Sequence, residues 1–194
     1  PAGYNFLFIY INGKSAYFNL STGVVGGTSG LTSNSITAAG NGFYKCSITF
    51  TGVTTSNVEI YLANTISSYV FTGDGTSGIY IQDAQLNQGS TALPYFATTT
   101  RLNLARVDYK DNVNGSLLLE PQRTNLLTWS EQFDNAAWTK NVSVSANSTI
   151  SPDGTQNADK ILESASNVQQ WAYQSLTLSG AQTATIYAKK AERN

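Results

Sequence analysis

The feature that most constrains the fold is a succession of short strand-like segments separated by turn residues. Residues 43–51 alternate apolar and polar side chains, as a strand with one buried face does. The side chains of this segment predicted to point inward are Tyr44, Cys46, Ile48 and Phe50. Asn-Gly dipeptides at positions 12–13 and 41–42 favour tight hairpin turns. The pattern predicts an all-β sandwich or barrel.

The other predicted strands are equally short, and no helical period persists for more than two turns. They cover residues 6–12, 15–20, 35–39, 58–63, 69–71, 78–86, 142–146, 159–163, 171–178 and 183–188. In the fourth of these, Val58, Ile60 and Leu62 should point inward. The glycine-rich residues 21–30 predict a loop with a short edge strand, and residues 131–138 predict one short helical turn.

Composition excludes several classes of function. Charged residues make up 12% of the chain, about half the usual share. The charged residues among the first 97 are only Lys14, Lys45, Glu59, Asp74 and Asp83. A nucleic-acid partner is therefore not expected, because phosphate binding needs clustered Lys and Arg. No segment has the roughly 18–20 apolar residues of a membrane span, so no membrane partner is expected either.

The residue types needed for common catalytic sites are also missing. The chain has no histidine, which excludes Ser-His-Asp and Cys-His catalysis and His-ligated zinc. No pair of carboxylates indicates glycoside hydrolysis, so we expect a non-enzymatic protein. The single cysteine, Cys46, cannot form an internal disulfide and is expected to be a small buried hydrophobic residue.

Four strings carry a resemblance to a known family. They are residues 117–140 (LLLEPQRTNLLTWSEQFDNAAWTK), 151–161 (SPDGTQNADKI), 41–52 (NGFYKCSITFTG) and 69–90 (YVFTGDGTSGIYIQDAQLNQGS). Together they resemble jelly-roll modules of phage tail fibres and head spikes, which are similar to carbohydrate-binding modules of families four and nine. The resemblance implies a jelly-roll β-sandwich of two antiparallel sheets, located in a virion or outside the cell.

The order of these strings differs from that of the family. Residues 1–97 resemble the C-terminal half of a module and residues 117–194 its N-terminal half, with residues 98–116 as a connector. Two interpretations stay open. The chain is either one circularly permuted module closed on itself, or a stretch from mid-repeat to mid-repeat of a tandem array. In an array, a head-to-tail neighbour or another copy of the chain would complete each sandwich.

Aromatic residues are the candidate sugar-binding groups, because a pyranose C–H face stacks on an aromatic plane. The candidates are Tyr10, Tyr17, Tyr61, Tyr80, Trp129, Trp138, Trp171, Tyr173 and Tyr187. Trp171 and Tyr173, with Gln169 and Gln170 to orient hydroxyl groups, form the predicted glycan site; the alternative is that both aromatics pack between the sheets. Trp129 and Trp138 are expected to have a structural packing role.

The resemblance further implies a structural calcium ion that ties the family's first strand to its last. Asp83 in YIQDAQL and Asp134 in EQFDN match the family's acids, whereas Gln82 replaces an acid that the family often has. Calcium takes 6–8 oxygen ligands, which carboxylates from distant strands can supply.

Three functions remain open. The first is a structural and adhesive component of a phage fibre, spike or surface filament that binds a surface glycan. The second is a carbohydrate-binding module of a secreted polysaccharide-active protein. The third is a self-assembling filament subunit without a ligand.

Overall fold

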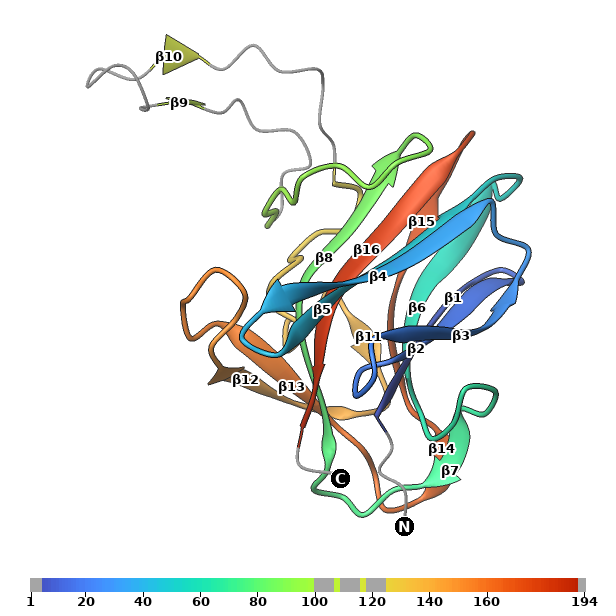
Figure 1. Cartoon of the computed structure of the whole chain (residues 1–194), viewed down its shortest axis with the longest axis vertical. Coiled ribbons are helices and arrows are strands. Elements are labelled where there is room, and N and C mark those ends of the chain that lie inside the picture. Colours follow the sequence, from blue (N-terminus) through green and yellow to red (C-terminus); the bar gives the residue numbers. More distant parts are fainter. Residues whose placement is uncertain (1–4, 100–106, 109–115, 118–124, 192–194) are drawn as a thin grey trace.

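The computed structural model describes residues 5–99, 107–108, 116–117 and 125–191. The described chain contains no helix, and two six-stranded antiparallel sheets pack against each other (Figure 1). The predicted all-β sandwich is therefore confirmed. Because each sheet ends in edge strands, the barrel that the strand pattern also allowed does not form.

Both sheets combine strands from the two ends of the sequence. Sheet A has the order β11 (Thr139–Lys140), β15 (Trp171–Thr177), β6 (Thr55–Ala63), β1 (Phe6–Ile11), β2 (Lys14–Asn19) and β3 (Val24–Ser29). Sheet B has the order β12 (Ser143–Thr149), β13 (Ala158–Leu162), β8 (Gly78–Gln88), β16 (Gln182–Lys190), β5 (Phe43–Phe50) and β4 (Ser33–Gly40). Two short pairs join β7 (Val70–Thr72) to β14 (Asn167–Gln169), and β9 (Val107–Asp108) to β10 (Ser116–Leu117).

The chain passes repeatedly from one sheet to the other. After β1–β3 in sheet A and β4–β5 in sheet B, the strands β6, β8, β11, β12–β13, β15 and β16 alternate between the sheets. Several neighbouring strands in each sheet are therefore distant in sequence, such as β1 and β6 in sheet A and β8 and β16 in sheet B, as in a jelly roll. This connectivity places β6, β1 and β15 side by side, and these three strands carry the candidate site.

The core lies between the two sheets and follows the predicted alternation. Cys46, Ile48 and Phe50 of β5 are fully buried, with Tyr44 packed against them. The predicted inward residues of β6 are also buried: Val58, Ile60 and Leu62. Apolar side chains from all central strands thus form one continuous cluster, as expected for two sheets packed about 10 Å apart.

Several predicted boundaries differ from the structure. The glycine-rich segment contains a complete strand, β3, and the weak strand predicted at 35–39 is the eight-residue β4. The short helical turn predicted at 131–138 does not form. Three successive turns replace it, in which residues 132, 135 and 138 each donate their N–H to the carbonyl three residues earlier. The edge strand predicted within residues 21–30 is thus confirmed, and only its length was underestimated, because Gly and Ser also favour loops.

Residues 125–138, here called the linking segment, connect the two sheets through two buried amides. The Asn125 side chain accepts from the N–H groups of Leu86 and Leu127 and donates to the carbonyls of Ala84 and Phe96. At Thr128 the backbone exchanges hydrogen bonds with the Gln174 amide of β15. One amide therefore binds the segment to β8 of sheet B, and the other binds it to sheet A.

The two predicted halves of the module contribute strands to both sheets. The start of β1 and the end of β16, next to the first and last described residues, lie at the same end of the sandwich (Figure 1). Most of the predicted connector, residues 98–116, lies outside the described residues. Circular permutation and completion by a neighbour both stay predictions.

Candidate functional site

The outer face of sheet A carries a row of four aromatic side chains on four adjacent strands. In the strand register Tyr17 is opposite Phe8, Phe8 is opposite Tyr61, and Tyr61 is opposite Trp171. Phe8 stacks on Tyr17 with ring centroids 4.0 Å apart. Since side chains of a strand alternate between faces, this row is on the side opposite the core.

Residues 64–69 fold over one part of this row. Tyr69 stacks on Phe8 at 4.9 Å between ring centroids and contacts Tyr61 at 5.0 Å. The carbonyl of Ile66 accepts a hydrogen bond from the N–H of Gly27. A Cβ on Gly26 would lie 2.9 Å from that of Ile66, so glycine is needed for the close approach. Phe8, Tyr17 and Tyr61 are buried as a result.

The rest of the face is open. Tyr10, Trp171 and Tyr173 are half-buried, and the Trp171 and Tyr173 rings lie 5.0 Å apart. Tyr10 and Tyr173 flank Glu59 in the register. An open groove of about 460 Å³ lies beside them; it is lined by Tyr10, Asn12, Thr55, Ser56, Asn57, Glu59 and Ser175. Aromatic planes and polar groups therefore share one accessible surface.

The polar groups of this groove form a hydrogen-bonded chain. Ser175 donates to Asn57 at 2.5 Å, Asn57 donates to Glu59 at 3.4 Å, and the Tyr61 hydroxyl donates to the other Glu59 oxygen. Burial and the hydrogen bond to Glu59 raise the pKa of Tyr61 above its ordinary value. Tyr61 therefore stays protonated at neutral pH and holds the Glu59 carboxylate in place.

Trp171 is held by a residue that sequence reasoning did not select. The Asn141 side chain accepts from the Trp171 N–H at 2.8 Å and donates to the Gln169 carbonyl at 2.6 Å. The Asn141 N–H also donates to the Trp171 carbonyl. Asn141 follows the two-residue strand β11, which was too short to be predicted from sequence, so no signal indicated this role.

The structure brings together only part of the predicted glycan site. Trp171 and Tyr173 share the open face of sheet A, whereas Gln170 is fully buried and accepts from the Ser164 N–H. Gln169 is exposed at the end of β14. Groove residues that the sequence prediction omitted include Asn57, Glu59 and Ser175. The alternation of β6 and β15 in the sequence would have indicated these residues, because Glu59 and Tyr61 fall on the face opposite Ile60.

The residues predicted to be structural lie as follows. Trp138 is buried, packs on Phe133 at 4.8 Å and donates its indole N–H to the Trp129 carbonyl. Trp129 itself is half-buried, with a backbone φ of 48°. Cys46 lies in the core, where burial raises the pKa of its thiol. Of the remaining aromatic candidates, Tyr80 and Tyr187 belong to sheet B rather than to the aromatic face.

Asp83 and Asp134 have different acidic neighbours. Asp83 occupies a bulge of β8 at a φ of 55°, and burial together with the Glu131 charge raises its pKa to about 7. Asp134 is exposed, and its charge acts on Asp159 instead. Within the described ranges, no group of three or more acidic or cysteine side chains is arranged to hold a metal ion. Calcium at Asp83 and Asp134 stays a prediction.

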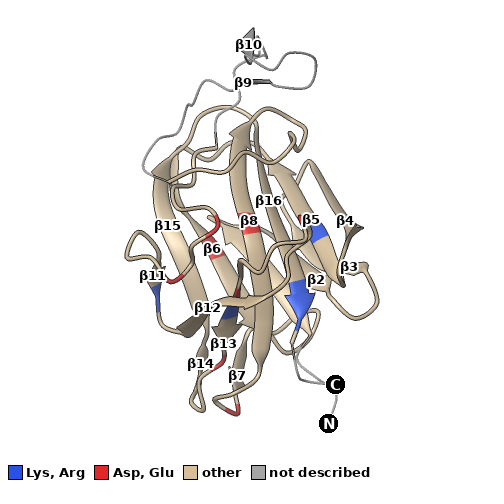
Figure 2. Cartoon of the chain, turned by 90° about the vertical axis from the view of Figure 1, so that its left-hand side faces the viewer, with Lys and Arg blue, Asp and Glu red and all other residues tan. Residues whose placement is uncertain are grey.

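Charged side chains are sparse on the strands of the sandwich. Figure 2 shows how few charged residues the strands of both sheets carry.

In the described part of the chain, no helix has the length and apolar character needed to cross a membrane.

Comparisons with known proteins gave no match: no family model, no curated protein and no solved structure matches the chain. The resemblance to phage spike modules and carbohydrate-binding modules therefore stays an interpretation of the four sequence strings.

Proposed function

We propose that this chain is a non-enzymatic β-sandwich that binds a glycan on the outer face of sheet A. The observation that carries the proposal is the open surface where Tyr10, Trp171 and Tyr173 adjoin the hydrogen-bonded chain of Ser175, Asn57 and Glu59. A sugar ring offers an apolar C–H face for the aromatic planes and hydroxyl groups for the polar chain.

The groove favours a neutral or weakly charged glycan. Glu59 is the one charged residue among the described groove residues, and its two oxygens already accept hydrogen bonds. A polyanionic glycan would need Lys or Arg beside it, and the described residues of the groove supply none. The groove extends across strands and is open, so it suits a stretch of several sugar units rather than one enclosed ring.

The biological setting that we propose follows the sequence resemblance. A glycan-binding sandwich in a virion fibre, spike or surface filament would act in adhesion. The same face would serve equally in a carbohydrate-binding module of a secreted polysaccharide-active protein. A hydrolase domain encoded beside this module would favour the second setting, and further copies of the 117–138 string would favour the first.

A second candidate function, assembly into a filament, has its own supporting observation. The adjacent edge strands β3 and β4 fall within residues 15–44, a run without any charged residue. Natural proteins commonly protect exposed edges with charges, because an unprotected edge can pair with another chain. Uncharged edges on both sheets therefore support self-association through this side of the sandwich.

The glycan proposal is tested with the variants Trp171→Ala and Tyr173→Ala on a glycan array and by calorimetry. We expect each variant to weaken binding of a recognised glycan by tenfold or more, because each removes a stacking surface. The control Tyr80→Ala changes a half-buried aromatic on sheet B and should leave affinity unchanged. Absence of binding to any glycan, or equal binding by all variants, would overturn the proposal.

A further inference from the structure

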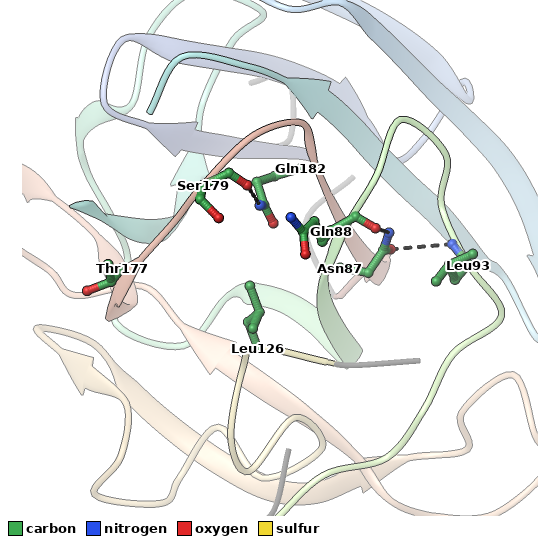
Figure 3. Close-up of a pocket in the computed structure, with 7 residues that line it drawn as sticks. All are labelled: Asn87, Gln88, Leu93, Leu126, Thr177, Ser179 and Gln182. Carbon is green, nitrogen blue, oxygen red and sulfur yellow. Dashed lines mark hydrogen bonds between the residues drawn. The ribbon is translucent and has the colours of Figure 1, made fainter. Parts of the chain in front are cut away.

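A second pocket lies at the end of the sandwich opposite the described chain ends. It has a volume of about 220 Å³ and lies where β8 ends and β16 begins (Figure 3). Its lining includes Gln88, Leu93, Leu126, Thr177, Ser179 and Gln182. The volume is below the roughly 300–1,000 Å³ of drug-sized ligand sites, so the pocket suits one small molecule.

The buried side chain of Gln182 indicates what such a molecule would offer. Its Nε2 donates to the Ser179 carbonyl at 2.6 Å. Because a carbonyl can only accept, Nε2 must be the atom that faces Ser179, and Oε1 is directed to the pocket side (Figure 3). Oε1 has no hydrogen-bond partner among the described residues, although Gln182 is only 1% exposed. A buried acceptor in this state favours a ligand that donates a hydrogen bond.

The other side chains around Gln182 are neutral: some carry amide or hydroxyl groups, and the others are leucines. Figure 3 shows the side chains of Gln88, Ser179 and Gln182 converging on the space above Leu126. Amides and hydroxyls both donate and accept, which matches the hydroxyl groups of a sugar or polyol. Leu93 and Leu126 offer apolar surface to a ring face. Every described lining residue is neutral, so nothing here would pair with a charged ligand.

We propose that this pocket binds one neutral sugar ring or a polyol of similar size, as a site separate from the face of sheet A. The inference does not depend on the glycan proposal, because none of its lining residues belongs to the groove beside Tyr10. A free monosaccharide and the terminal ring of a longer glycan both have the required chemistry.

The test uses nuclear magnetic resonance of the whole chain with assigned glutamine side-chain amides. The probes are glucose, galactose, mannose, N-acetylglucosamine, myo-inositol and the disaccharides of the hexoses. At least one probe should shift the Gln182 and Gln88 amide signals saturably. Ser179→Trp, which fills the pocket from an exposed position, should weaken this binding tenfold or more. A disaccharide that binds as tightly as its monosaccharide would indicate recognition of a terminal ring.

Two further variants make the result decisive. Gln88→Ala, also at an exposed position, should weaken binding, whereas Tyr173→Ala on sheet A should leave it unchanged. The proposal is overturned if no probe shifts these amides, or if binding persists in Ser179→Trp. Binding lost in Tyr173→Ala would likewise overturn it, since the probe would then occupy the sheet A face. Loss of glycan-array binding alone would contradict only the glycan proposal.

Discussion

At the residue scale, single side-chain amides determine how the linking segment is attached. Asn125 is fully buried and uses its oxygen for two backbone N–H groups and its nitrogen for two carbonyls. Alanine would leave these backbone groups without the partners they now have. A buried polar group that loses its partner costs about 1–3 kcal/mol.

We therefore expect Asn125→Ala to lower the free energy of unfolding by on the order of 3 kcal/mol, measured by urea denaturation. Asn34→Ala, at an exposed position of β4, is the matched control and should change stability by less than about 0.5 kcal/mol. Equal effects of the two substitutions would show that the hydrogen bonds of Asn125 do not stabilise the fold.

The raised pKa of Asp83 predicts a specific pH dependence. Its folded-state pKa of about 7 exceeds its ordinary value of 3.8, so the folded state binds this proton more tightly than the unfolded state. The resulting stabilisation is fully present below about pH 4 and is lost as the pH rises through 7. Asp83→Asn should therefore be more stable than the native chain at pH 8, on the order of 2 kcal/mol, with the difference vanishing toward pH 4.

The measurement is thermal or urea unfolding across this pH range in the presence of a chelator. Asn is a suitable replacement because it tolerates the positive φ that Asp83 adopts. Asp134→Asn, at an exposed aspartate, is the control. A pH-independent difference for Asp83→Asn would contradict the prediction. Repeating the series in millimolar calcium tests the calcium prediction, because a bound cation would favour the carboxylate and make the native chain the more stable one at pH 8.

At the element scale, local patterns predicted most strands and the two hairpins at the Asn-Gly turns, β1–β2 and β4–β5, but not the pairing of strands that are distant in sequence. The alternation in residues 43–51 and 58–63 identified the core faces of β5 and β6. The same alternation would have excluded Gln170, because Trp171 and Tyr173 fall on one face and even-numbered positions on the other. The row from Tyr17 to Trp171, however, also depends on pairing β1 with β6 and β6 with β15, which are distant in sequence. No local pattern carries that information.

The short elements around the site escaped prediction for a related reason. β11 has two residues and β14 has three, and neither has an apolar run that would distinguish it from a loop. Their position depends on hydrogen bonds from Asn141 and on pairing with β15 and β7. The candidate glycan site was therefore only half predictable: the sequence indicated its aromatics and which polar residues of β6 and β15 share their face, but not the strand pairing that joins them into one groove.

The uncharged edge strand β4 gives a test of the filament proposal. If edges pair between copies, the native chain should form species that grow with concentration in light scattering. Replacing Ser33 and Ser35 together by lysine places charges on the exposed edge and should keep the chain monomeric. Lysines at Ala165 and Ser166, on an exposed turn away from the edge, are the control. A monomeric native chain at all concentrations would exclude edge pairing.

At the scale of the whole molecule, the arrangement of strands bears on how the two halves are joined. Both six-stranded sheets contain strands from residues before and after the predicted connector, so neither half has a complete large sheet of its own. In sheet B, β8 lies between β13 and β16. The strand pairing is therefore independent of which peptide bond joins the halves, provided that the chain ends can meet.

A circular permutant tests this inference and the permutation interpretation together. It begins at Leu117, and a short Gly-Ser linker joins Asn194 to Pro1. We expect it to fold with the same circular dichroism spectrum and to unfold within a few degrees of the native chain, because the described ends share one end of the sandwich and short loops close at little entropic cost. A permutant that begins at Gln82, within β8, is the control and should be strongly destabilised, since it interrupts a central strand. If the sandwich is instead completed by a neighbour, the native chain will be oligomeric in light scattering and the Leu117 permutant will alter that state.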